Sequence, residues 1–139
     1  MTDSAEPDNV DRPAVDPNDP DEVDPREALI AERDSTRALV ETLAARLEAV
    51  LEATADTAAD DEHDPEGATL AVERGHIVAQ LERSRTRLEE LDAAFQRVEE
   101  GTYGICEVCG EPIAAVRLEV LPAARMCVTC AARNPRRQW

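Results

Sequence analysis

Four cysteines near the C-terminus constrain the fold of this chain more than any other feature of its sequence. Cys106 and Cys109 form one Cys-x-x-Cys pair, Cys127 and Cys130 form a second, and 17 residues separate the two pairs. Two residues between cysteines let both thiolates reach one metal ion from a tight turn, and a second pair completes a tetrahedral site of four sulfurs. The spacing therefore predicts one zinc ion bound by these four residues.

Four cysteines also allow two disulfides, a thiol redox site or an iron–sulfur cluster. The N-terminal sequence lacks the basic start and apolar stretch of a signal peptide, and no apolar run approaches membrane-spanning length. We therefore expect a cytoplasmic protein with no membrane association, and disulfides are rare in that compartment. A redox Cys-x-x-Cys is typical of a βαβ unit, which this sequence does not predict. Because four thiolates leave no open coordination position, the zinc is expected to be structural and not catalytic.

The composition favours long helices that pack along a narrow seam. The 139 residues include one Phe, one Tyr and one Trp, and the apolar residues are mostly Ala, Leu and Val among many Glu and Arg. The net charge of −16 repels nucleic acid, so we do not expect sequence-specific DNA binding. A basic groove on another protein, or a site that holds metal ions, would attract such a surface.

Two stretches before the cysteines have the pattern of amphipathic helices. Asp24-Pro25-Arg26-Glu27 combines an N-cap, a proline at the first helical position and a capping-box Glu, and Asp64-Pro65-Glu66 repeats this chemistry. After each start, seam residues recur at alternating spacings of four and three. The first seam comprises Leu29, Arg33, Thr36, Val40, Leu43, Leu47, Val50 and Thr54, and the second comprises Leu70, Arg74, Ile77, Leu81, Ser84, Leu88, Leu91, Phe95 and Val98.

These patterns predict a mainly α fold, an antiparallel two-helix coiled-coil hairpin followed by a small C4 zinc-finger module. Residues 1–24 carry nine acids, one base and four prolines, and are expected to be a disordered acidic tail. Residues 25–100 form the hairpin, a rod roughly 40 Å long with an acidic tip loop at residues 55–67. Gly101 is expected to end the second helix, and residues 101–139 form the zinc module with a short terminal helix from Cys127.

The segment GTYGICEVCGEPIAAVRLEVLPAARMCVTC, residues 101–130, resembles the C4 zinc finger of the DksA/TraR family. The matching positions are Gly101, Tyr103, Gly104, Cys106, Cys109, Gly110, Ile113, Arg117, Leu118, Pro122, Cys127 and Cys130. The helical hairpin is also the family's architecture, so the resemblance covers roughly residues 25–134. It implies a bacterial, zinc-binding transcription regulator that binds RNA polymerase through the secondary channel, with an acidic hairpin tip that approaches the catalytic centre.

The tip residues that the resemblance assigns to partner binding are Asp60, Asp61, Glu62 and Asp64. Better-known members of the family carry an Asp-x-x-Asp-x-Ala motif at the tip. The nearest match here begins at Asp61, keeps both Asp positions and has Glu66 in place of the Ala. Two structural explanations stand beside this one, because Asp64 is also a sufficient N-cap and an acidic loop is often a solvated connection.

The resemblance implies a protein without catalytic activity, and an exposed acidic loop has no pocket that would shift carboxylate pKa values or exclude water. We expect a monomer with RNA polymerase as its partner. Two other functions stay open on the residues alone. One is a zinc-stabilised adaptor that binds another protein through the flanks of the hairpin, and the other is a thiol or zinc redox sensor, which requires a reactive thiolate.

Overall fold

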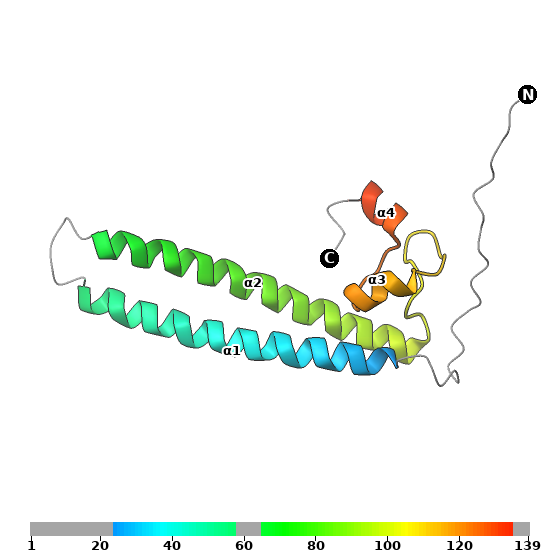
Figure 1. Ribbon diagram of the computed structural model, residues 1–139, viewed down its shortest axis with the longest axis horizontal. Coiled ribbons are helices and arrows are strands. Elements are labelled where there is room, and N and C mark those ends of the chain that lie inside the picture. Colours follow the sequence, from blue (N-terminus) through cyan, green and yellow to red (C-terminus); the bar gives the residue numbers. More distant parts are fainter. Residues whose placement is uncertain (1–23, 58–64, 135–139) are drawn as a thin grey trace, which may run out of the picture.

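The computed structural model describes residues 24–57 and 65–134, and two long helices dominate this part of the chain (Figure 1). Helix α1 spans Pro25–Thr57, and α2 spans Pro65–Glu100 and runs antiparallel beside it. Two short helices follow, α3 at Ala115–Val120 and α4 at Val128–Arg133. The prediction of a mainly α fold, a helical hairpin followed by a small cysteine module, is confirmed. In the described residues no helix has the length and apolarity to cross a lipid bilayer.

Helix α1 begins with the capping interaction that the sequence predicts. The backbone N–H of Arg26 donates to a side-chain oxygen of Asp24 at 2.9 Å, and the N–H of Glu27 donates to the Asp24 carbonyl at 3.0 Å. Two of the N–H donors left free at a helix N-terminus are thereby satisfied. Pro25 at the first helical position has no N–H that needs an acceptor.

The seam positions of both helices form the hairpin core, with one exception. Leu43, Val50, Ile77 and Leu81 are buried in one cluster, against which Val40, Leu47 and Leu70 pack. All eight predicted seam residues of α1 are buried or half-buried, as are the predicted residues of α2 other than Arg74. Arg74 is exposed, which agrees with a seam arginine whose charged end reaches the edge of the rod. An arginine gains more from hydration of its charge than from burial of its stem.

Helix α2 ends in a left-handed turn at Gly101. Gly101 has a φ of +77°, its N–H donates to the Val98 carbonyl at 3.3 Å, and the N–H of Thr102 donates to the Arg97 carbonyl at 2.9 Å. This is the Schellman pattern, which satisfies the last helical carbonyls and reverses the chain. The reversal brings the cysteine module back alongside the base of the hairpin (Figure 1).

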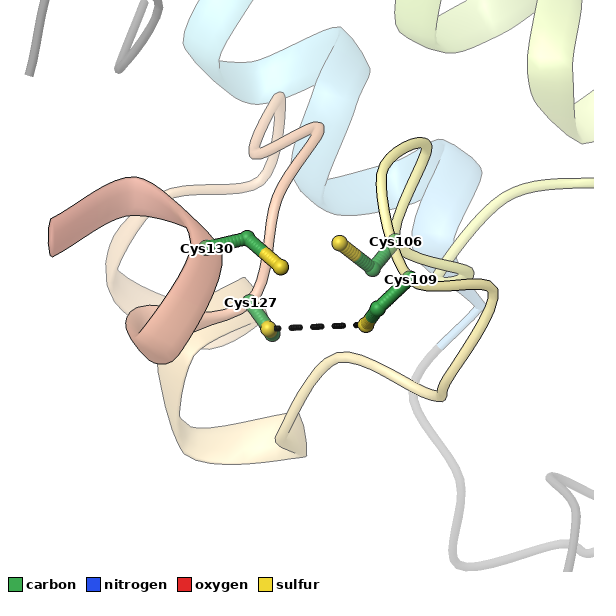
Figure 2. Close-up of side chains that lie close together, drawn as sticks. All are labelled: Cys106, Cys109, Cys127 and Cys130. Atoms are coloured by element: carbon green, nitrogen blue, oxygen red, sulfur yellow. Dashed lines mark hydrogen bonds between the residues drawn. The ribbon is translucent and has the colours of Figure 1, made fainter. Parts of the chain in front are cut away.

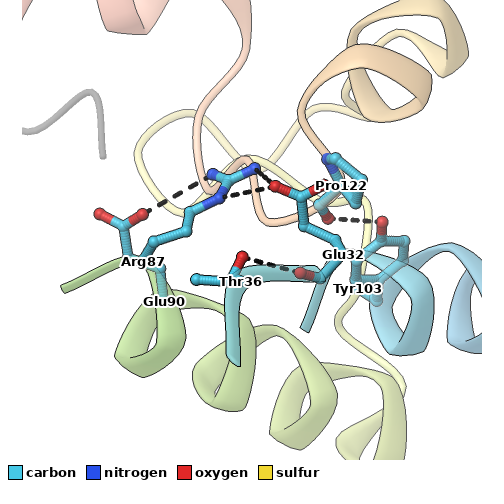
Figure 3. A network of polar contacts seen from close by, with 6 residues as sticks. All are labelled: Glu32, Thr36, Arg87, Glu90, Tyr103 and Pro122. Carbon is cyan, nitrogen blue, oxygen red and sulfur yellow. Dashed lines mark hydrogen bonds and ion pairs between the residues drawn. The ribbon is translucent and has the colours of Figure 1, made fainter. Parts of the chain in front are cut away.

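The module packs on the base of the hairpin, where it contacts the end of the seam and also covers Ala94, an α2 residue outside the seam. Ala94 and Leu91 of α2 are buried in one cluster with Leu29 of α1 and Ala123 of the module. The Tyr103 hydroxyl donates to the Pro122 carbonyl at 2.6 Å and ties the start of the module to its middle (Figure 3). The base of the hairpin is therefore buried from two sides, whereas among the described residues the rest of each long helix packs mainly on its partner helix.

Candidate metal centre

The structure brings the four cysteines together at one point. Their sulfur atoms all lie within 4.8 Å of one another, and Sγ of Cys109 lies 3.8 Å from Sγ of Cys127 (Figure 2). A zinc–sulfur bond of about 2.3 Å in a tetrahedron gives a sulfur–sulfur edge of about 3.8 Å. All four cysteines are free thiols and not disulfides. The donor set and its spacing fit one zinc ion.

The first cysteine pair sits in a tight knuckle. The N–H of Cys106 donates to the Glu111 carbonyl at 2.8 Å, and the N–H of Gly110 donates back to the Cys106 carbonyl at 3.0 Å. Gly110 has a φ of +75°, in the left-handed region that glycine occupies without strain. The knuckle turns the chain within a few residues, which points both thiols toward the same side.

The second cysteine pair belongs to the start of α4. Cys127 is the N-cap residue of this helix, and Cys130 lies in its first turn. The N–H of Ala131 donates to the Cys127 carbonyl at 2.9 Å and closes that turn. Residues three apart lie on the same side of a helix, so both sulfurs face the knuckle.

The thiols of the cluster differ in their readiness to ionise. Burial alone would raise the pKa of Cys106, but hydrogen bonds from the backbone N–H groups of Cys109, Cys127 and Val108 lower it to about 6. The neighbouring Cys127 sulfur and burial raise the pKa of Cys130 to about 12. Four sulfurs at this spacing repel one another once ionised, so a divalent cation is needed to hold them all as thiolates.

The small core of the module is built around this cluster. Cys106 and Cys130 are buried together with Ile113, Met126 and Ala131. Cys109 is exposed and Cys127 is half-buried, so one side of the cluster faces solvent. A core this small does not fold alone in general, and metal ligation supplies the missing stabilisation in modules of this kind.

The predicted tip residues Asp60, Asp61, Glu62 and Asp64 lie outside the described residues. The residues on either side, Thr57 and Pro65, end α1 and begin α2 at the end of the rod away from the cysteines. The cysteine module and the place where α1 ends and α2 begins therefore lie at opposite ends of the rod.

Three charged residues at the junction of module and hairpin were not found from the sequence. Glu107, between the first two cysteines, pairs with Arg125 of the module at 2.9 Å and with Arg97 of α2 at 3.7 Å. Burial lowers the pKa of Arg97, and the nearby Glu107 carboxylate opposes this effect. Charge patterning gives no signal for such a group, because its members are 10 and 18 residues apart along the chain.

The comparisons with known proteins identify the same segment. Residues 101–136 match the prokaryotic dksA/traR C4-type zinc finger. The segment is therefore a C4 zinc finger whose four close cysteines can bind one zinc ion.

Several proteins resemble the chain over a longer stretch. An RNA polymerase-binding transcription factor DksA of Caulobacter vibrioides is 39% identical over 71 residues, which are 51% of this chain and 50% of that protein. General stress protein 16O of Bacillus subtilis is 41% identical over 68 residues, 49% of this chain and 42% of that protein. The chain thus spans about half the length of these curated relatives. The structure of transcription factor DksA2 from Pseudomonas aeruginosa is 28% identical, covers 80% of this chain and 85% of that one, and has a TM-score of 0.47.

Proposed function

We propose that this chain, whose residues 101–136 match the prokaryotic dksA/traR C4-type zinc finger, is a zinc-binding transcription regulator that binds RNA polymerase directly. The observation that carries this proposal is the likeness to a protein named as an RNA polymerase-binding transcription factor. Cys106, Cys109, Cys127 and Cys130 are the proposed zinc ligands, and the ion has a structural role. Residues 101–139 act as the zinc module and residues 25–100 as the hairpin.

The finer part of the proposal concerns how the hairpin reaches the polymerase. Helix α2 has 36 residues, which corresponds to about 54 Å at 1.5 Å per residue. Because the rod is only two helices wide, it is narrow enough to enter a channel that would exclude a globular domain (Figure 1). We propose that the rod enters the secondary channel and that Asp60, Asp61, Glu62 and Asp64 approach the catalytic centre. Carboxylates are suited to that place, because a metal-containing centre attracts negative charge.

Binding is the first test of the proposal. The full chain, loaded with zinc, is mixed with purified bacterial RNA polymerase and the complex is measured at low and at moderate salt. We expect a complex under both conditions, because insertion of a rod buries apolar and polar contacts as well as charge pairs. Absence of binding in zinc-loaded protein would remove the proposed function altogether.

Transcription in vitro then tests the tip. A variant in which Asp60, Asp61 and Asp64 are replaced by Asn should bind polymerase but lose most of its effect on initiation. The matched control replaces the exposed α1 acids Glu41, Glu48 and Glu52 by Gln, which removes the same number of charges from the shaft. We expect the control to act like the unmodified protein. Equal effects of both variants would mean that the tip is only a connection between the helices.

A further inference from the structure

A chain of alternating charges crosses the junction between the hairpin and the zinc module. Its members come from α1, from α2, from the first cysteine knuckle and from the loop before α4, so it links four separate parts of the fold. In order they are Glu32, Arg87, Glu90, Arg125, Glu107 and Arg97.

The hairpin half of this chain joins the two long helices. The Arg87 guanidinium donates through Nη2 and Nε to one oxygen of Glu32, at 3.1 and 3.3 Å, and Nη1 lies 3.8 Å from Glu90 (Figure 3). Burial raises the pKa of Glu90, and the positive charges of Arg87 and of Arg125 in the module oppose this effect. The hairpin half therefore ends at a residue of the module.

The module half centres on Glu107, whose two carboxylate oxygens serve different arginines. One oxygen accepts a hydrogen bond from Nε of Arg125 at 3.0 Å and lies 2.9 Å from its Nη2. The other oxygen lies 3.7 Å from Nη1 of Arg97. The N–H of Glu107 also donates to the Arg125 carbonyl at 3.0 Å. Contacts with Arg125 inside the module thus hold the Glu107 side chain in place, and the same side chain pairs with Arg97 of α2.

Arg97 makes this contact necessary. Its side chain is only 11% exposed, and an arginine stays charged at any ordinary pH. Among the described residues Glu107 is its ion-pair partner, and the Ala123 carbonyl accepts a hydrogen bond from its Nη2 at 3.4 Å. Removing the partner of a buried charge is far more harmful than removing an exposed ion pair.

Glu107 lies between Cys106 and Cys109, so the turn that presents it is the turn that presents two of the sulfurs. We propose that Glu107 is a positioning residue that fixes the zinc module in one orientation on α2, and that it thereby sets the direction in which the rod projects. The claim about orientation concerns the isolated protein. Its consequence for polymerase, that module and tip engage together, rests on the proposed function.

Hydrogen exchange in the isolated, zinc-loaded protein tests the orientation directly. In Glu107→Gln the amides of residues 121–126 should exchange about tenfold faster than in the unmodified protein. This effect is larger than that of losing an exposed ion pair and smaller than that of losing a fully buried one. The matched control is Glu111→Gln, two residues beyond Cys109, whose side chain forms no ion pair with a described residue. The control should exchange like the unmodified protein, and all three proteins should retain one zinc per chain.

A double variant separates positioning from general loosening. Arg97→Met combined with Glu107→Gln removes both charges, so no buried guanidinium is left unpaired. If the two residues act as a pair, the double variant exchanges more slowly than Glu107→Gln alone. Small-angle scattering should show a larger radius of gyration for Glu107→Gln only.

Additive effects in the double variant, or a Glu107→Gln protein that exchanges like Glu111→Gln, would overturn the inference. Neither measurement involves polymerase, so failure here is distinct from failure of the proposed function. If the orientation changes as expected, the same variant should bind polymerase more weakly while its tip sequence is intact.

Discussion

The shaft of the hairpin, meaning its two long helices, and the zinc module are stabilised in opposite ways. The shaft buries a row of apolar side chains, among them Leu43, Ile77 and Leu81, and each adds its own increment of buried apolar surface. The module has a core of five buried residues, two of which are the cysteines Cys106 and Cys130. Stability is therefore distributed along the shaft and concentrated at one point in the module. Damage to the shaft should be graded, and damage to the metal centre should be complete.

Loss of a metal ligand is the strongest test of this contrast. Cys130→Ser should lose zinc and unfold the module, because a structural zinc contributes on the order of 10 kcal/mol to the folding of small metal modules. Hydrogen exchange should show unprotected amides in residues 101–134, whereas circular dichroism should show that most of the helical signal remains. Thr129→Ser, an exposed change between the same two cysteines, is the control. A module that stays protected without metal would break the comparison.

A cavity in the shaft should have a smaller and purely local effect. Leu81 is 4% exposed in the seam, and Leu81→Ala should lower the free energy of unfolding of the hairpin by about 2–5 kcal/mol. Urea denaturation followed by circular dichroism measures this change, and zinc content should stay at one per chain. Val72→Ala, at a residue 60% exposed on the same helix, should change stability very little. Zinc loss in Leu81→Ala would show that the two regions are coupled more strongly than their packing indicates.

The N-cap of α1 should contribute less than a core residue. Asp24→Ala removes the side-chain acceptor for the Arg26 N–H and should cost about 1 kcal/mol. The same denaturation experiment measures it, with the exposed mid-helix Asp34→Ala as the control. If both substitutions have the same effect, the capping geometry does not stabilise the helix.

The smallest expected effect depends on pH. Burial raises the pKa of Glu90, and the nearby Arg87 opposes this without cancelling it. The ionised carboxylate is therefore penalised in the folded state, and the protein loses stability as the pH rises through the raised pKa. Glu90→Gln should be slightly more stable than the unmodified protein at pH 7, and this advantage should vanish below the unfolded-state pKa of about 4.3. The exposed Glu82→Gln is the control, and a Glu90→Gln protein that is less stable at pH 7 would mean that the ion pair outweighs burial.

The same contrast explains which features the sequence can predict. The seams repeat over many turns, so one exposed residue in the pattern, Arg74, did not obscure the hairpin. The cysteine spacing predicts the metal centre because two-residue gaps have few other uses. The docking face of α2 could not be predicted, since buried Ala94 and Arg97 lie off the seam and are covered only because the chain reverses at Gly101. Helix α3 was missed as well, because it has no side-chain N-cap and no buried residue that would mark it in the sequence.

The module contacts the hairpin near its base, at Leu29 and Leu91. The end of α1 and the start of α2 lie at the opposite end of the rod. Reach and anchoring are consequently separate properties of this molecule. Adding one heptad to each arm would preserve the seam and lengthen the rod by about 10 Å. The length of the rod is thus adjustable in steps of two helical turns, with the metal centre left as it is.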